Sequence, residues 1–348
     1  MYQVCKSTTC GILAVALLAF VAGGTAFGAH HEEMLWNVYE GGDGPGAGKH
    51  VVLLSGDEEY RSEETMPQYG KILAERHGFK CTVLYSLNED GEIDPENQEN
   101  VTGLHHLKDA DLMIMFFRFR RPPREDAKHI EDYLNSGKPM IGLRTSTHAF
   151  NYEEGPYKKW GDGSEEPRWE GGFGRVVFGE KWISHWGHHG EESTRGLIVD
   201  GQEGHPILRG IKDGDIWGTT DVYEVRKPML PTVTPLVLGQ VLDDMTPNGK
   251  PVKGEKNDNI MPVSWTNSYT SPSWNTSRVF NTTMGASEDF SSEGTRRMLV
   301  NAVYWALEME DEIPEEGTNV DLVGEYKWTP FGFGAHTVGV RPSDHAME

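Results

Sequence analysis

The sequence predicts an α/β protein whose sheet is mostly parallel. Apolar runs of strand length alternate, along the first half of the chain, with segments of helical character. These runs are apolar throughout rather than at every second residue, which is typical of parallel strands covered by helices on both faces. The predicted strands are residues 50–54, 80–85, 112–117 and 139–143, and the predicted helices among them are Thr65–His77 and Arg124–Ser136.

The boundaries of these helices follow from local signals. Gly78 and Gly137 come directly after the two helices, where glycine commonly accepts the left-handed backbone of a helix end. Pro67 lies in a first turn, where its missing N–H costs little. The second half is less regular, with a predicted helix at 292–308 and a long polar loop at 151–195. Further strand-like runs lie near residues 196–199, 221–225, 235–238, 261–265 and 278–281.

The N-terminus reads as a targeting segment. Lys6 precedes the apolar run Gly11–Ala22, and small residues follow at 23–29, which is the pattern of a cleaved signal peptide. We therefore expect export to the periplasm or the extracellular space, with no stable membrane insertion after cleavage. A retained membrane anchor is the alternative. The predicted organisation is a signal peptide at 1–28, a Gly-rich lead-in at 29–48, one α/β domain at 49–310 and a surface-wrapping tail at 311–348.

Composition limits the partners. The formal net charge of −22 repels phosphate backbones, so nucleic acid is excluded as a favoured partner. Of the 3 cysteines only Cys81 remains after signal cleavage, so no intrachain disulfide forms and stability must come from the core. Many of the 10 tryptophans lie outside the predicted strands, where they fit sugar faces or, alternatively, pack loops onto the body.

The segment Gly142–Phe150 carries the most chemistry. It follows a predicted strand and has small residues, Gly142 and Ser146, on either side of an apex at Arg144. This is the pattern of a nucleophile elbow, a sharp strand-to-helix turn. Because arginine is no nucleophile, the usual chemistry of such an elbow is missing. A Ser146/His148 pair is a remaining alternative, although Ser146 is not at the apex and His148 follows it too closely.

Other polar clusters follow the predicted strands or lie in the long loop. Residues 57–63 follow the first strand, three arginines at 118–121 follow the third, and 185–192 is rich in histidine. Because neighbouring parallel strands end at the same edge of a sheet, the strand-end clusters are expected to meet in one crevice. Such a set suits acid–base work or the binding of a polyhydroxylated ligand. The alternative is a salt-bridge cluster that only ties loops together.

The histidine-rich segment raises the question of a metal. His185, His188, His189 and Glu191 offer enough donor atoms for a divalent cation. Their spacing matches no established helical metal motif, and the intervening Trp and Gly residues indicate an irregular loop. We therefore predict no cofactor, with a divalent metal at these four residues as the alternative.

Several segments together resemble the secreted ThuA-like (trehalose utilisation) proteins. The resemblance covers roughly residues 48–335 and rests on 52–61, 142–150, 182–190, 205–208, 221–225, 262–265, 278–285 and 301–307. It implies a class I glutamine amidotransferase-like, flavodoxin-like three-layer sandwich and a role in sugar metabolism, including 3-keto sugars made from disaccharides. Amidotransferases carry Cys at the elbow apex, whereas this chain has Arg144, so glutaminase activity is not expected. Many relatives have His near that place; here the imidazole is at His148.

The resulting hypothesis is an exported protein that binds or converts a sugar or 3-keto sugar by acid–base chemistry, as a hydrolase, lyase or isomerase. The alternatives are a non-catalytic module that binds a glycan or a partner, and a metal-dependent hydrolase. The predicted catalytic residues are His148, Asp57, Glu58, His185 and His188. The predicted ligand-binding residues are Arg61, Arg118, Arg144, Thr145, Trp182, Trp186 and His189.

Overall fold

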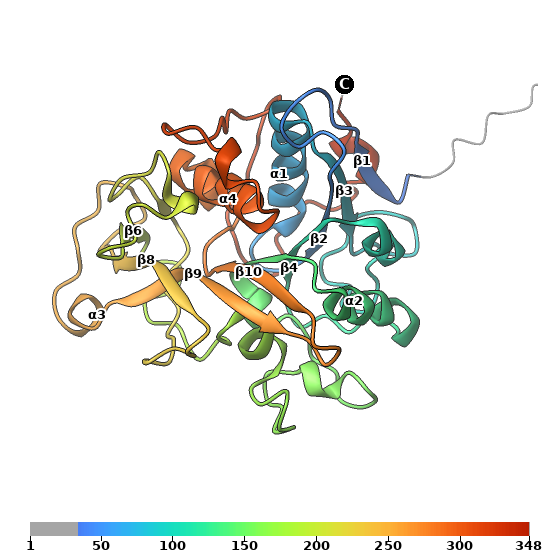
Figure 1. Cartoon of the computed structure of the whole chain (residues 1–348), viewed down its shortest axis with the longest axis horizontal. Coiled ribbons are helices and arrows are strands. Elements are labelled where there is room, and N and C mark those ends of the chain that lie inside the picture. The colour runs from blue at the N-terminus through green and yellow to red at the C-terminus, as the bar shows by residue number, and fades with distance from the viewer. Residues whose placement is uncertain (1–33, 348) are drawn as a thin grey trace, which may run out of the picture. The chain divides into compact units, whose positions relative to one another are not determined.

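The computed structural model describes residues 34–347, and the predicted signal peptide lies outside the described residues. One 10-stranded sheet runs through this part of the chain, in the order β1-β3-β2-β4-β5-β10-β9-β8-β6-β7 (Figure 1). Its strands are β1 (Trp36–Tyr39), β2 (His50–Gly56), β3 (Lys80–Tyr85), β4 (Leu112–Phe117), β5 (Met140–Leu143), β6 (Thr194–Ile198), β7 (Trp217–Gly218), β8 (Thr234–Val241), β9 (Met261–Thr270) and β10 (Thr276–Thr282).

The helices are α1 (Ser62–His77), α2 (Arg124–Ser136), α3 (Glu255–Asp258) and α4 (Glu293–Ala306). Short helical turns are η1 (Leu104–Asp109), η2 (Arg144–His148), η3 (Lys158–Trp160), η4 (Gly174–Phe178), η5 (Pro206–Leu208), η6 (Asp289–Ser291), η7 (Glu310–Glu312) and η8 (Pro342–His345). Within residues 34–347, no helix combines the length and the apolar character that crossing a membrane requires.

The sheet is mixed rather than mostly parallel. Its centre, β3-β2-β4-β5-β10, is parallel, as the apolar runs predict. On one side β1 pairs antiparallel with β3, and on the other β9, β8, β6 and β7 continue the sheet antiparallel. The prediction of an α/β fold is confirmed, and the parallel character holds only for the centre, because β9 and β10 form a hairpin rather than a helical crossover.

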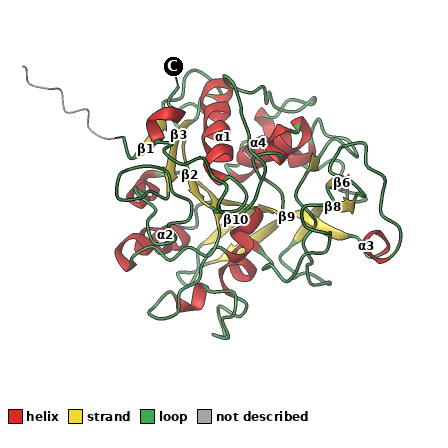
Figure 2. Ribbon diagram, turned by 180° about the vertical axis from the view of Figure 1, so that it is seen from behind, coloured by secondary structure: helices red, strands yellow, loops and turns green. Residues whose placement is uncertain are grey.

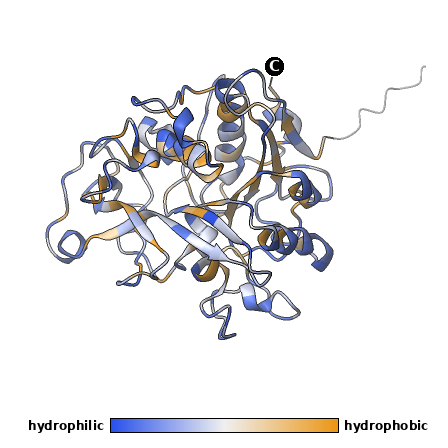
Figure 3. Ribbon diagram, viewed as in Figure 1, coloured by the Kyte–Doolittle hydropathy of each residue, from blue (hydrophilic) through white to orange (hydrophobic). Residues whose placement is uncertain are grey.

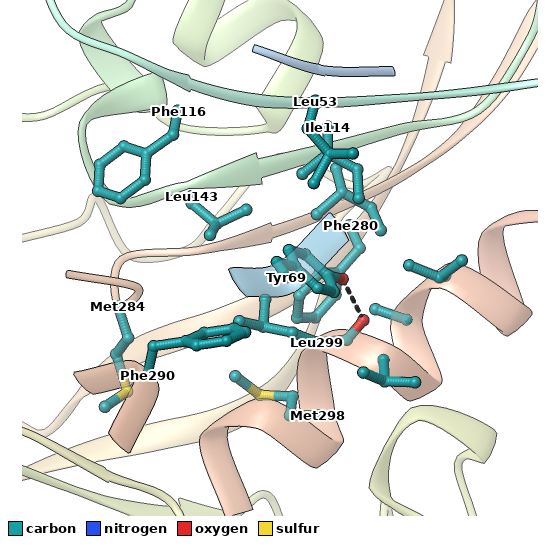
Figure 4. Packing of buried hydrophobic residues seen from close by; sticks show 14 of the residues in the cluster. Leu53, Tyr69, Ile114, Phe116, Leu143, Phe280, Met284, Phe290, Met298 and Leu299 are labelled. Atoms are coloured by element: carbon teal, nitrogen blue, oxygen red, sulfur yellow. Dashed lines mark hydrogen bonds between the residues drawn. The ribbon is translucent and has the colours of Figure 1, made fainter. Parts of the chain in front are cut away.

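Helices cover both faces of the sheet (Figures 1 and 2). On one face, α1 and α4 pack on a core that includes Leu53, Ile114 and Phe280 (Figure 4). The Tyr69 hydroxyl of α1 donates to the Leu299 carbonyl of α4 at 2.6 Å, which ties the two helices together. The opposite face packs against α2, η1 and η4. In Figure 3 the strand β3 is coloured mainly as hydrophobic, and the helix α2 mainly as hydrophilic.

Three segments differ from the sequence prediction. The lead-in contains the edge strand β1, which is too short to give a periodic signal. Residues 221–225 form no strand; only an isolated bridge joins Tyr223 to His185. The predicted loop at 151–195 contains η3 and η4, and its Trp160 and Trp169 are buried in the second core.

Candidate functional site

The candidate site lies where β2, β4 and β5 end. These strands are neighbours in the parallel centre of the sheet, so the residues that follow them meet at one edge. Each exit carries a non-glycine residue with a left-handed backbone: Arg61 at φ 59°, Phe119 at φ 49° and Arg144 at φ 41°. Such backbone strain costs on the order of 1–3 kcal/mol per residue and clusters at functional sites, which points to this edge.

Arg144 is the apex of the predicted elbow, and its side chain is fully buried. One terminal nitrogen, Nη1, donates to the backbone carbonyls of Asp221 at 2.6 Å and Thr283 at 2.8 Å. The other, Nη2, donates to the Asp221 Oδ1 at 2.7 Å and to the Tyr60 hydroxyl at 3.0 Å. The guanidinium also lies over the Tyr223 ring, 3.7 Å from its centroid. Arg144 is therefore placed to hold Asp221.

Asp221 in turn binds two imidazoles. Its Oδ2 lies 2.8 Å from the Nδ1 of His185, and its Oδ1 lies 3.2 Å from the Nδ1 of His189. Burial raises the pKa of Asp221, but Arg144, His185 and His189 outweigh it and hold the pKa below its usual range. Asp221 is therefore ionised at neutral pH, and the two histidines share one buried anion.

The two histidines differ in their second nitrogen. The Nε2 of His189 lies 3.2 Å from the Oε1 of Glu59, so this ring bridges two carboxylates. Hydrogen bonds to Asp221 and Glu59 raise the pKa of His189 to about 9, which makes it an imidazolium at neutral pH. Because the carboxylate of Asp221 can only accept, the Nδ1 of His185 donates to it, and in a neutral ring the Nε2 is then an acceptor. The His185 side chain is 37% exposed and thus accessible to a ligand.

His148, at the end of the elbow, lies among aromatic side chains of the candidate site. Its ring centroid lies 5.0 Å from that of Phe119, 5.5 Å from that of Trp182 and 6.3 Å from that of Tyr223. Burial lowers the pKa of His148 well below its usual range, and the nearby Arg118 acts in the same direction. His148 is therefore a neutral imidazole in a largely aromatic setting.

Asp57 and Glu58 are engaged by the protein. Asp57 Oδ1 accepts the backbone N–H of Glu59 at 2.7 Å, and the Thr145 hydroxyl donates to Oδ2, which links the β2 exit to the elbow. Burial, with Glu58 nearby, raises the pKa of Asp57 to about 6. Glu58 accepts hydrogen bonds from both Arg118 and the fully buried Arg120.

Two further predicted binding residues make structural contacts. Arg61 is fully buried and donates to the Glu58 carbonyl at 3.2 Å and to the carbonyl of Gly332 in the tail. Trp186 donates its indole N–H to the Lys256 carbonyl at 2.9 Å and packs on the core. The structure does not bring their polar atoms together with His185.

The histidines of the segment 185–192 do not all lie at the candidate site. His185 and His189 join Asp221, whereas the exposed imidazole of His188 makes no hydrogen bond among residues 34–347. The groups that could hold a cation are His185, His189 and Asp221, whose donor atoms lie within 4.8 Å of one another. This set replaces His188 and Glu191 of the sequence prediction with Asp221.

Sequence reasoning missed Asp221, Tyr223 and Glu59 as members of this site. The sequence predicts a strand at Asp221 and Tyr223. Thr219, Thr220 and Asp221 are nevertheless three consecutive polar residues, which is unusual for a buried strand. That run was the available signal. Glu59 lies within the polar segment 57–63, and its sequence context does not set it apart from the other residues there.

A separate surface cavity of about 820 Å³ is lined by residues between Asn151 and Glu166. Its lining includes Lys158, Lys159 and Glu165 but none of the residues at the strand exits. Buried groups with perturbed pKa values and charged partners are the better mark of a functional site. We therefore place the candidate site at the strand exits.

One family model covers most of the chain. The family model described as ThuA, trehalose utilisation, matches residues 50–306. A ThuA-like protein from Bacteroides uniformis is similar in structure, with 14% identity, 76% of this chain and 93% of that chain covered, and a TM-score of 0.46. A ThuA-like protein from Parabacteroides merdae gives 16% identity, 86% and 99% coverage, and a TM-score of 0.44. No curated protein matches the chain.

Proposed function

The chain belongs to the ThuA (trehalose utilisation) family, and from that premise we propose that it binds a sugar or 3-keto sugar and converts it by acid–base chemistry at His185. The observation that carries this proposal is the chain of contacts Arg144–Asp221–His185, with Nδ1 to Oδ2 at 2.8 Å. A histidine oriented by a buried carboxylate is the usual arrangement of a general base.

The proton step uses groups that the protein already orients. The Nε2 of His185 accepts a proton from the ligand, and the ionised Asp221 stabilises the imidazolium that forms. Arg144 keeps Asp221 ionised and fixes its orientation. Trp182, whose ring lies 5.7 Å from that of His185, offers an apolar face to a sugar ring.

Two further proposals concern the chain as a whole. The fold is that of the class I glutamine amidotransferase-like, flavodoxin-like superfamily, but without glutaminase activity, because Arg144 stands where a nucleophilic cysteine would be. The chain is exported, with residues 1–28 as its signal peptide, on the pattern of Lys6 and the apolar run that follows.

The test is turnover of a panel of 3-keto-glucosides by the wild type and by His185→Ala. We expect His185→Ala to lower kcat by about 10²- to 10⁴-fold, as loss of a general base does. His105→Ala, an exposed histidine outside the site, is the matched control. Full activity in His185→Ala would refute the proposed base. Binding without turnover in the wild type would identify a non-catalytic module, and neither binding nor turnover would exclude the sugar function.

A metal-dependent hydrolase is the second candidate, favoured by the position of His185, His189 and Asp221. Two imidazoles and a carboxylate are a common ligand set for Zn²⁺ with an open fourth position. Metal analysis of the purified protein, with activity measured before and after chelation, decides the matter. A metal-free protein whose activity withstands the chelator excludes this candidate.

A further inference from the structure

Part of the C-terminal tail is fixed against the candidate site. Residues 326–334, called here the strap, cross the exit of β2 and the start of α1. The backbone N–H and hydroxyl of Thr329 donate to the Glu64 carboxylate at 2.8 and 2.6 Å. The N–H of Gly332 donates to the Glu59 carbonyl at 2.8 Å. These bonds fix the strap in place, so it is a preformed part of the surface rather than a loose end.

The strap packs against Tyr60 and His189 through one aromatic side chain. The Phe331 ring lies 5.3 Å from that of Tyr60 and 5.0 Å from that of His189, measured between centroids. Tyr60 is fully buried, and its hydroxyl accepts a hydrogen bond from Arg144. Phe331 therefore packs against His189 and against the buried ring of Tyr60, to which Arg144 donates.

Phe333, two residues further along the strap, is 59% exposed. The Arg118 guanidinium lies 4.8 Å from the centroid of the Phe333 ring and 4.8 Å from that of Phe119. Phe119 contacts His148, as described above. A continuous row of side chains therefore runs from Phe333 of the strap through Arg118 and Phe119 to the elbow. An aromatic ring held beside a guanidinium offers a ligand an apolar face next to hydrogen-bond donors.

We propose that the strap is the outer wall of the candidate site and that Phe333 contacts the bound ligand. The ligand is a compound with an apolar C–H face, which packs on Phe333, and with hydroxyl or keto oxygens, which accept hydrogen bonds from Arg118. The identity of the ligand rests on the proposed function. The strap lies beyond residue 306, where the family match ends, so this wall is supplied by a part of the chain outside the family domain.

The test compares Phe333→Ala with Trp274→Ala, a control that removes a ring 80% exposed in the turn between β9 and β10. KM and kcat are measured with the 3-keto-glucoside that the wild type turns over, and Kd by calorimetry if it only binds. We expect Phe333→Ala to raise KM or Kd about three- to tenfold with kcat nearly unchanged, the size of one lost aromatic contact. Trp274→Ala keeps both values. Unchanged KM and Kd in Phe333→Ala overturn the ligand contact.

A second measurement needs no ligand. Hydroxyl-radical oxidation, read by mass spectrometry, reports the exposure of Tyr60 and His189. We expect Phe331→Ala to increase oxidation of both residues severalfold, and Trp274→Ala to leave it unchanged. Unchanged oxidation in Phe331→Ala overturns the wall. If the wild type binds no sugar, the proposed function and the sugar contact of Phe333 fail, and this measurement alone decides whether the strap covers Tyr60 and His189.

Discussion

Arg144 joins a strained backbone to a buried ion pair. The guanidinium is fully buried, and its nearest anion, Asp221, is fully buried as well. Taking two charges out of water is costly, and removing only one of them leaves the other uncompensated. Both the fold of the site and the orientation of His185, which binds Asp221, therefore depend on this pair.

We predict that Arg144→Ala lowers the free energy of unfolding by about 3–5 kcal/mol, because it strands the Asp221 carboxylate in the interior. The measurement is urea denaturation at neutral pH. Lys128→Ala is the control, since Lys128 pairs with Asp132 on the exposed side of α2; about 1 kcal/mol or less is expected there. A loss below about 1 kcal/mol in Arg144→Ala would mean that the pair contributes little.

For single residues, the sequence predicts the turn at the elbow but not the role of Arg144 at its apex. Gly142 and Ser146 predicted a sharp elbow, and the left-handed backbone of Arg144 agrees with one. The partner that defines the role of Arg144 is Asp221, which lies 77 positions further along the chain. Local spacing carries no information on such a contact, because it depends on how the antiparallel half of the sheet packs.

Helix α1 begins inside the candidate site, and its second residue, Glu63, is buried without a hydrogen-bond partner on either carboxylate oxygen. Burial raises the pKa of Glu63 to about 8, and Arg61 at 3.8 Å is too weak a partner to reverse it. Glu63 is therefore protonated in the folded protein at neutral pH, whereas it ionises near pH 4.5 in the unfolded chain.

This difference in the pKa of Glu63 between the folded and unfolded states makes the stability of the protein depend on pH. The folded state binds one more proton than the unfolded state between pH 4.5 and about 8, so rising pH destabilises the wild type in that window. We predict that Glu63→Gln gains stability relative to the wild type there, by at most about 1.4 kcal/mol per pH unit. Urea titrations at several pH values measure the gain. Glu75→Gln, exposed on the same helix, is the control, and a pH-independent difference for Glu63→Gln would contradict the assignment.

Elements with strong local signals were predictable, and those fixed by tertiary contacts were not. Helix α2 forms at Arg124–Ser136, as the sequence predicts, because an amphipathic stripe ends at Gly137. Residues 221–225 include Val222, Tyr223 and Val225, which favour a strand, but they form none, and only an isolated bridge joins Tyr223 to His185. The strap has no periodicity at all, and its position depends on bonds to Glu59 and Glu64.

At the scale of the described part of the chain, one core connects the parallel and antiparallel halves of the sheet. Ile114 in β4 and Leu236 in β8 belong to the same buried cluster, together with Met298 of α4. The junction between the halves is the antiparallel pairing of β10 with β9. Neither half has its own separate core on this face, so we expect them to unfold together.

We predict that Ile114→Ala and Leu236→Ala each shift one common unfolding transition, at a cost of about 2–5 kcal/mol for a buried side chain. Urea denaturation followed by tryptophan fluorescence and by far-ultraviolet circular dichroism measures it, and the two signals should give the same midpoint. Val338→Ala, exposed in the tail, is the control. Two transitions, each sensitive to only one variant, would show that the halves fold independently. The site would then lie at a junction between them, because Arg144 and His148 follow a parallel strand while Asp221 and His185 come from the antiparallel half.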